Sequence, residues 1–65
     1  MSTFLERLKE EELELASKAI KLQEFMSTEA FVELSEGNQY LLDKQLGVMG
    51  EYLNILGTRI ELNSI

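Results

Sequence analysis

The stretch from residue 38 to residue 62 most constrains what this chain can fold into. Its apolar residues recur at alternating spacings of four and three, as in a helix that packs along one seam. The seam consists of Leu42, Leu46, Met49, Leu53, Leu56 and Ile60. Beside it on one side lie Gly47, Gly50, Asn54 and Gly57, and on the other Leu41, Gln45, Val48, Tyr52, Ile55 and Arg59. A helix with so few solvated positions needs partners on more than one side, which predicts a helical oligomer.

The length of the chain supports the same prediction. The 65 residues form one domain, predicted over 1–65. Below about 70–80 residues a single core rarely supplies more than about 3–5 kcal/mol, so small folds add disulfides, metals or oligomerisation. The chain has no cysteine and no histidine, which excludes disulfides and disfavours a zinc site. Oligomerisation remains as the source of additional burial, as a dimer, a tetramer or a larger assembly.

The pattern predicts an all-α fold, an antiparallel hairpin of two long helices that assembles into a bundle. A first helix is expected over residues 4–26, starting at a capping box formed by Thr3 and Glu6. A helical turn containing Ala30, Phe31 and Leu34 follows, and the second helix runs over 38–62. Antiparallel pairing then places residues whose numbers add to roughly 65 at the same level.

The first helix is expected to bury a broad inner face. Its predicted members are Phe4, Leu8, Leu15, Ala19, Leu22 and Met26, widened by Leu5, Leu13, Ala16, Ile20 and Phe25. Glu10, Glu11 and Glu12 are interpreted as a solvated face. Adjacent residues on a helix point about 100° apart and do not converge on a metal ion, so no metal site is predicted there.

Charge limits the partners. Twelve acidic against six basic residues give a net charge of −6, which disfavours long nucleic acid because its binding depends on many Lys and Arg contacts. A small ligand with one or two phosphates stays compatible. No apolar run approaches the roughly 20 residues that span a bilayer, and the first residues do not predict a secretory signal. A cytoplasmic protein is expected, in the cytoplasm of the host cell if a phage encodes it.

Two polar stripes on the second helix are candidate ligand sites. Gln45, Tyr52 and Arg59 are spaced by seven, so an amide, an aromatic ring and a guanidinium share one side. They could read a base edge, stack on a base and bind a phosphate. The alternative is that Tyr52 lies at the core edge, Arg59 pairs with a carboxylate of a neighbouring chain, and Gln45 lies on the surface. The second stripe consists of Tyr40, Lys44, Gly47, Glu51 and Asn54, with Lys18 of the first helix nearby; its alternative is an ordinary solvated face.

The glycines allow two interpretations as well. Glycine costs about 1 kcal/mol relative to alanine inside a helix, so Gly47, Gly50 and Gly57 require a reason. One is close helix–helix packing, and the other is a bare backbone floor for a flat ligand.

Nothing in the sequence indicates catalysis. The chain has neither cysteine nor histidine to act as nucleophile or base, and it contains no Gly-x-Ser-x-Gly or phosphate-loop motif. No enzymatic activity and no cofactor are predicted.

The second half also resembles a known family. The resemblance rests on a set of spaced residues: Phe25-Met26, Phe31, Leu34, Leu41-Leu42, Gln45, Met49, Tyr52, Ile55-Leu56 and Arg59-Ile60, preceded by Lys18-x-x-x-Leu22. This pattern resembles very short helical-hairpin proteins of tailed phages, related to a crAss-like phage product. In size and helical design the chain is also similar to phage anti-CBASS sponges, which assemble as oligomers and sequester cyclic oligonucleotide immune signals without cleaving them. The resemblance implies ligand pockets between subunits, with Lys18, Gln45, Tyr52 and Arg59 as the matching polar positions.

These observations lead to one functional hypothesis and two rivals. The hypothesis is a phage immune-evasion protein that sequesters a cyclic di- or trinucleotide such as 3′,3′-cGAMP at oligomer interfaces. Its candidate ligand-binding residues are Lys18, Tyr40, Lys44, Gln45, Tyr52, Asn54 and Arg59. The rivals are an acidic protein-binding inhibitor or DNA mimic, and a purely structural helical assembly module.

Overall fold

The computed structural model describes residues 3–64, and these form three helices. They are α1 (Phe4–Phe25), α2 (Glu29–Val32) and α3 (Glu36–Leu62). The predicted all-α class is confirmed. Residues 1, 2 and 65 of the predicted domain lie outside the described residues.

Each helix begins at a hydroxyl side chain that accepts a hydrogen bond from a backbone N–H three residues later. Thr3 accepts from Glu6 at 3.1 Å and caps α1. Thr28 caps α2 and Ser35 caps α3 in the same way, at 3.4 and 3.3 Å. These bonds satisfy donors that a helix start leaves without an intrahelical partner. The cap at Ser35 explains why α3 starts two residues before the predicted position 38.

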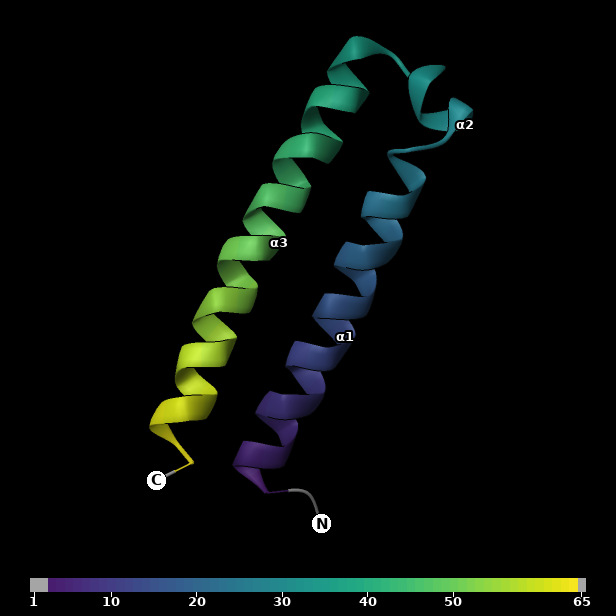
Figure 1. The fold of residues 1–65 in the computed structure, drawn as a ribbon. Coiled ribbons are helices and arrows are strands. Elements are labelled where there is room, and N and C mark those ends of the chain that lie inside the picture. The colour runs from purple at the N-terminus through teal and green to yellow at the C-terminus, as the bar shows by residue number, and fades with distance from the viewer. Residues whose placement is uncertain (1–2, 65) are drawn as a thin grey trace.

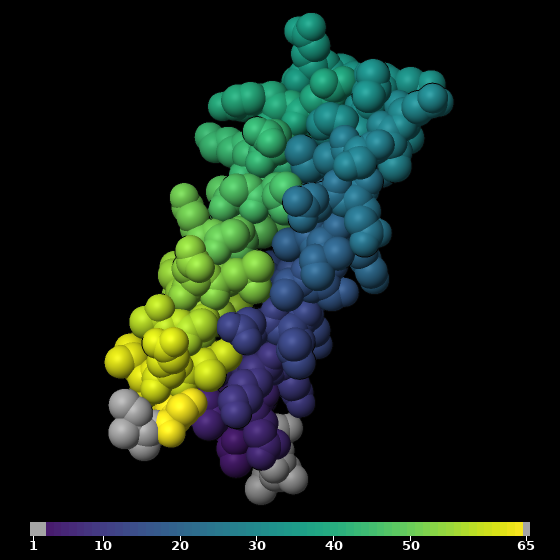
Figure 2. All heavy atoms as spheres, in the orientation of Figure 1, coloured from purple at the N-terminus to yellow at the C-terminus, as the bar shows by residue number. Residues whose placement is uncertain are grey.

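The two long helices lie side by side and run in opposite directions, so both ends of the described chain are at the same end of the molecule (Figure 1). They contact each other along their length, and the molecule is a rod of 46 × 19 × 14 Å (Figure 2). Within the described residues, no helix is sufficiently long and apolar for a membrane span. Along most of its length, each long helix packs only on the other long helix.

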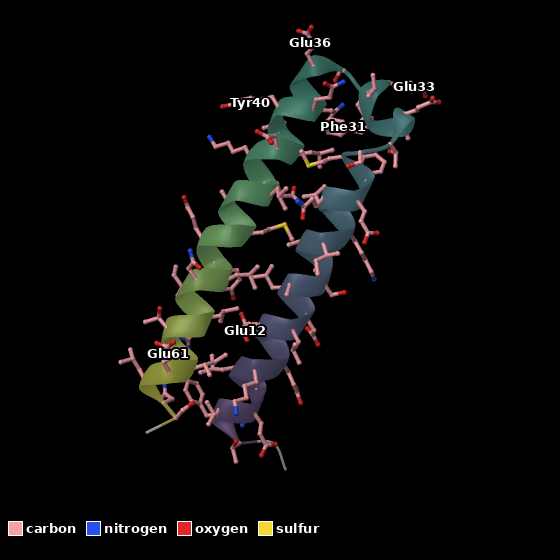
Figure 3. All side chains as sticks on the ribbon, in the orientation of Figure 1. Glu12, Phe31, Glu33, Glu36, Tyr40 and Glu61 are labelled. Atoms are coloured by element: carbon pink, nitrogen blue, oxygen red, sulfur yellow. The ribbon has the colours of Figure 1, made fainter. Side chains whose placement is uncertain are left out.

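The bend between the long helices is held by specific contacts. The rings of Phe25 and Phe31 meet edge to face with centroids 6.1 Å apart, a favourable geometry for aromatic pairs. The side-chain amide of Gln39 donates to the carbonyl oxygens of Val32 and Leu34 at 3.0 and 2.9 Å. Phe31 lies at this bend in Figure 3. The bend thus fixes where α3 begins relative to α1.

The core between α1 and α3 is narrow. Among the described residues only Leu8 of α1 and Leu56 of α3 are fully buried, at 3% and 0% exposure. The other predicted seam residues of α3 are all partly buried. They are Leu42, Leu46, Met49, Leu53 and Ile60. The heptad pattern therefore identified the face of α3 that packs on α1.

The predicted inner face of α1 was too wide. Phe4, Leu13, Ile20 and Phe25 are exposed, because a single neighbouring helix covers only a narrow stripe of α1. The prediction of a solvated face at residues 10–12 was wrong for Glu11 and Glu12, which are both partly buried against α3. Figure 3 shows the Glu12 side chain directed toward α3.

We expect Leu56→Ala to lower the free energy of unfolding by about 2–5 kcal/mol, because it removes buried methyl groups and leaves a cavity. The matched control is Leu13→Ala, at a position 70% exposed, for which a change within about 0.5 kcal/mol is expected. Urea denaturation at one fixed protomer concentration measures both. Equal losses for the two variants would contradict the described core.

Candidate functional site

Tyr52 connects the candidate site to the first helix. It lies in the second half of α3 and is 41% exposed. Its hydroxyl donates a hydrogen bond to the carboxylate of Glu11 on α1. The aromatic ring therefore lies at the edge of the seam between the helices, with one end held and much of its surface open to solvent.

The same contact changes the acidity of the phenol. The hydrogen bond to Glu11 raises the pKa of Tyr52, because an ionised phenol could no longer donate to the carboxylate. Desolvation and the negative charge of Glu11 raise this pKa further, whereas the positive charge of Arg59 lowers it. Glu11 and Arg59 thus both act on the Tyr52 hydroxyl.

Arg59 lies close to the end of α3, where a cation also complements the helix dipole. Its guanidinium carbon is 5.9 Å from the centroid of the Phe4 ring on α1, within the range of a cation–π contact. The contact orients the guanidinium and leaves its N–H groups available, since an aromatic ring face does not replace a hydrogen-bond acceptor.

Arg59 also borders a hollow of about 290 Å³ on α3, lined by Asn54, Ile55, Thr58 and Arg59. The Thr58 hydroxyl donates to the backbone carbonyl of Asn54 at 3.0 Å. Residues that carry an amide and a guanidinium therefore border the hollow, but its exposed lining is mostly apolar. Such a lining suits the apolar face of a planar ligand.

The structure brings together only part of the predicted site. Asn54 and Arg59 line the hollow. Tyr52 lies near Arg59 but outside the hollow, on the opposite side of α3 from Asn54, because positions two apart on a helix point about 200° apart. Lys18, Tyr40, Lys44 and Gln45 are exposed and do not line the hollow. Tyr40 is fourteen positions before Asn54, roughly 21 Å along a helix, and its side chain points away from α1 near the bend (Figure 3).

The packing of α1 on α3 does not require glycine at positions 47, 50 or 57. A Cβ atom built on Gly47 or Gly50 meets nothing within 4 Å, and one on Gly57 lies 3.5 Å from a Glu12 carboxylate oxygen, an ordinary contact distance. Close packing inside one chain therefore accounts for none of them. Packing against another chain and a ligand floor remain as the two interpretations.

Four residues at this end of the molecule were not predicted as site residues. They are Phe4, Glu11, Ile55 and Thr58. The predicted antiparallel register could have identified Phe4 and Glu11, because it places the first half of α1 beside the second half of α3. Nothing in the spacing distinguished Ile55 and Thr58 from other residues beside the seam. Across residues 3–64, no group of three or more potential ligands gathers in a way that could hold a metal ion.

These features define a class, a small all-α protein with an open hollow on the second half of its longest helix, bordered by an amide and a guanidinium. The model of the Sequestin family matches residues 2–62, and the chain belongs to this family. Comparison with curated proteins and with solved structures gives no match.

We expect Glu11→Gln to lower the pKa of Tyr52, because it removes the negative charge that opposes ionisation of the phenol. Titration of phenolate absorbance in a Tyr40→Phe background isolates this group. The hydrogen bond stabilises the fold while the phenol is protonated. Its contribution is therefore complete below the unfolded pKa of about 10 and is lost as the pH rises through the higher folded pKa. An unchanged midpoint in Glu11→Gln would contradict the contact.

We expect Gly50→Ala to raise the free energy of unfolding by about 1 kcal/mol, because alanine has the higher helix propensity and its Cβ meets open space in the chain. Thermal unfolding measures the change. Gly50→Leu, which adds bulk at the same position, distinguishes the two interpretations further. A loss of assembly indicates close packing of copies, whereas a loss of ligand binding alone indicates a floor.

Proposed function

We propose that this protein sequesters a cyclic oligonucleotide, a di- or trinucleotide such as 3′,3′-cGAMP, and does so without cleaving it. The observation that carries the proposal is that Asn54 and Arg59 line one hollow on α3, while the charge of Arg59 also acts on the Tyr52 hydroxyl. The name of the Sequestin family supports it, since it suggests sequestration of a ligand. The biological setting that we propose is phage evasion of CBASS immunity in the host cytoplasm.

Each of the three residues has a role in this proposal. The Tyr52 ring stacks on a base, a contact worth roughly 1–3 kcal/mol. The Arg59 guanidinium binds a phosphate through charge-assisted hydrogen bonds, and Asn54 reads a base edge with its amide. Binding alone lowers the concentration of free signal, so no turnover is needed.

The shape of the hollow supports a site shared between copies. Ligand pockets usually cover most of the ligand, whereas this hollow of about 290 Å³ lies open on the surface of one helix. A cyclic dinucleotide therefore needs further walls. Another copy of the chain supplies them in our proposal, together with exposed polar groups such as Gln45, Lys18, Tyr40 and Lys44.

An acidic surface on α1 favours one alternative. Glu6, Glu10 and Glu14 are exposed at a spacing of four, so three carboxylates follow one face of the helix. A protein-binding inhibitor or DNA mimic would use this face. Its binding would weaken steeply with salt, which distinguishes it from a nucleotide-binding protein.

We expect calorimetry to show binding of at least one member of a panel of cyclic di- and trinucleotides, with a matching rise in melting temperature. Arg59→Ala should weaken this binding by about 1.5–3 kcal/mol through loss of a charge-assisted contact. The matched control is Lys21→Ala, which removes one exposed positive charge near the other end of the rod.

Tyr52 offers a second control. Tyr52→Ala should lose the stacking contribution, whereas Tyr52→Phe keeps the ring and should retain most of the affinity. If the whole panel produces neither heat nor a melting shift at about a hundredfold excess, the sequestration proposal fails and the acidic-surface alternative takes its place.

A further inference from the structure

A second seam runs along α3 next to the one that packs on α1. We call it the Tyr52 stripe, and it consists of Leu41, Gln45, Val48, Tyr52, Ile55, Arg59 and Leu62. The spacing alternates between four and three over 21 residues, roughly 32 Å of helix. All seven residues are exposed in the free chain, so a complete coiled-coil-like seam lies uncovered.

The order of residue types in the Tyr52 stripe is similar from both ends. Tyr52 is central and is flanked on each side by an aliphatic residue, then a polar residue, then a leucine. Two such stripes packed in opposite directions match each other, with Val48 beside the partner's Ile55 and Gln45 beside the partner's Arg59. A two-fold interface requires this kind of self-complementary surface.

We infer that the Tyr52 stripe is the surface on which a second copy of this chain packs, in antiparallel orientation about a two-fold axis at Tyr52. The burial within one chain supports a second copy as the occupant, since only Leu8 and Leu56 are buried among the described residues. A stable interface covers about 800 Å² on each partner, roughly a sixth of the 5154 Å² surface of the chain. A seam along most of α3 is long enough to provide this area.

The interface also specifies the geometry of ligand binding, a step that rests on the proposed function. It places Gln45 of one copy near the partner's Arg59 on each side of the axis, and the two Tyr52 rings near each other at the axis. In our proposal a phosphate and a base edge are therefore bound by residues of both chains, and a base stacks on the part of the Tyr52 ring that the partner leaves open. The two Arg59 backbone positions lie fourteen helical positions apart across the axis, roughly 21 Å.

The first test uses matched valines and no nucleotide. Val48 and Val32 are both exposed, at 54% and 71%, but only Val48 belongs to the Tyr52 stripe. By sedimentation or light scattering, Val48→Glu should shift the protein toward smaller species, whereas Val32→Glu should behave like the unchanged protein. Circular dichroism verifies that both variants remain helical. A monomeric unchanged protein, or a Val48→Glu variant that assembles normally, overturns the inference.

The second test uses disulfide formation, which the absence of natural cysteine makes unambiguous. A mixture of Val48→Cys and Ile55→Cys proteins should form the mixed disulfide dimer on oxidation. Val48→Cys alone should not, because its two copies lie about 12 Å apart along the axis and a disulfide needs Cα atoms within about 7 Å. Asp43→Cys, on another face of α3, is the control for random collision.

The disulfide pattern separates the inference from the proposed function. Efficient Val48→Cys homodimers would indicate parallel packing and overturn the antiparallel interface. If the mixed disulfide forms but no nucleotide binds, the result supports the antiparallel interface and contradicts the sequestration proposal.

Discussion

The contact between α1 and α3 is the interaction on which the rest of the structure depends. Both long helices carry apolar residues beyond one face, but away from the bend each packs only on the other. Full burial within the described residues is therefore confined to Leu8 and Leu56. The faces beside the contact between α1 and α3 remain available for other molecules. The exposed apolar residues and the open glycines of α3 are consequences of this one-sided packing.

One-sided packing also determines how the candidate site is oriented. Tyr52 and Arg59 lie next to the covered face of α3, and each contacts α1, through Glu11 and Phe4 respectively. Such contacts restrict the rotamers of both side chains before any ligand binds, which lowers the ordering cost of binding. For the ligand that we propose, the carboxylate of Glu11 beside Tyr52 disfavours a phosphate at that position, whereas the guanidinium of Arg59 favours one nearby.

The sequence predicted the helices and the face of α3 that packs on α1, because caps and heptad spacing are local signals. The predicted inner face of α1 was wider than the observed one. Residue type and spacing alone do not distinguish exposed apolar residues such as Phe4 and Leu13 from buried ones. The site was predictable only in part. The spacing of seven selected Tyr52 and Arg59, but the contacts with Glu11 and Phe4 depend on register, and the hollow depends on side chains such as Ile55 and Thr58.

The most direct test of the central claim, sequestration without cleavage, is recovery of ligand from the complex. The protein is equilibrated by dialysis against 3′,3′-cGAMP and against other cyclic di- and trinucleotides, then denatured, and the released nucleotide is identified by chromatography. The account predicts depletion of free nucleotide in proportion to the protein and its full recovery in cyclic form. Linear products would contradict binding without turnover, and an absence of depletion across all the nucleotides would contradict sequestration itself.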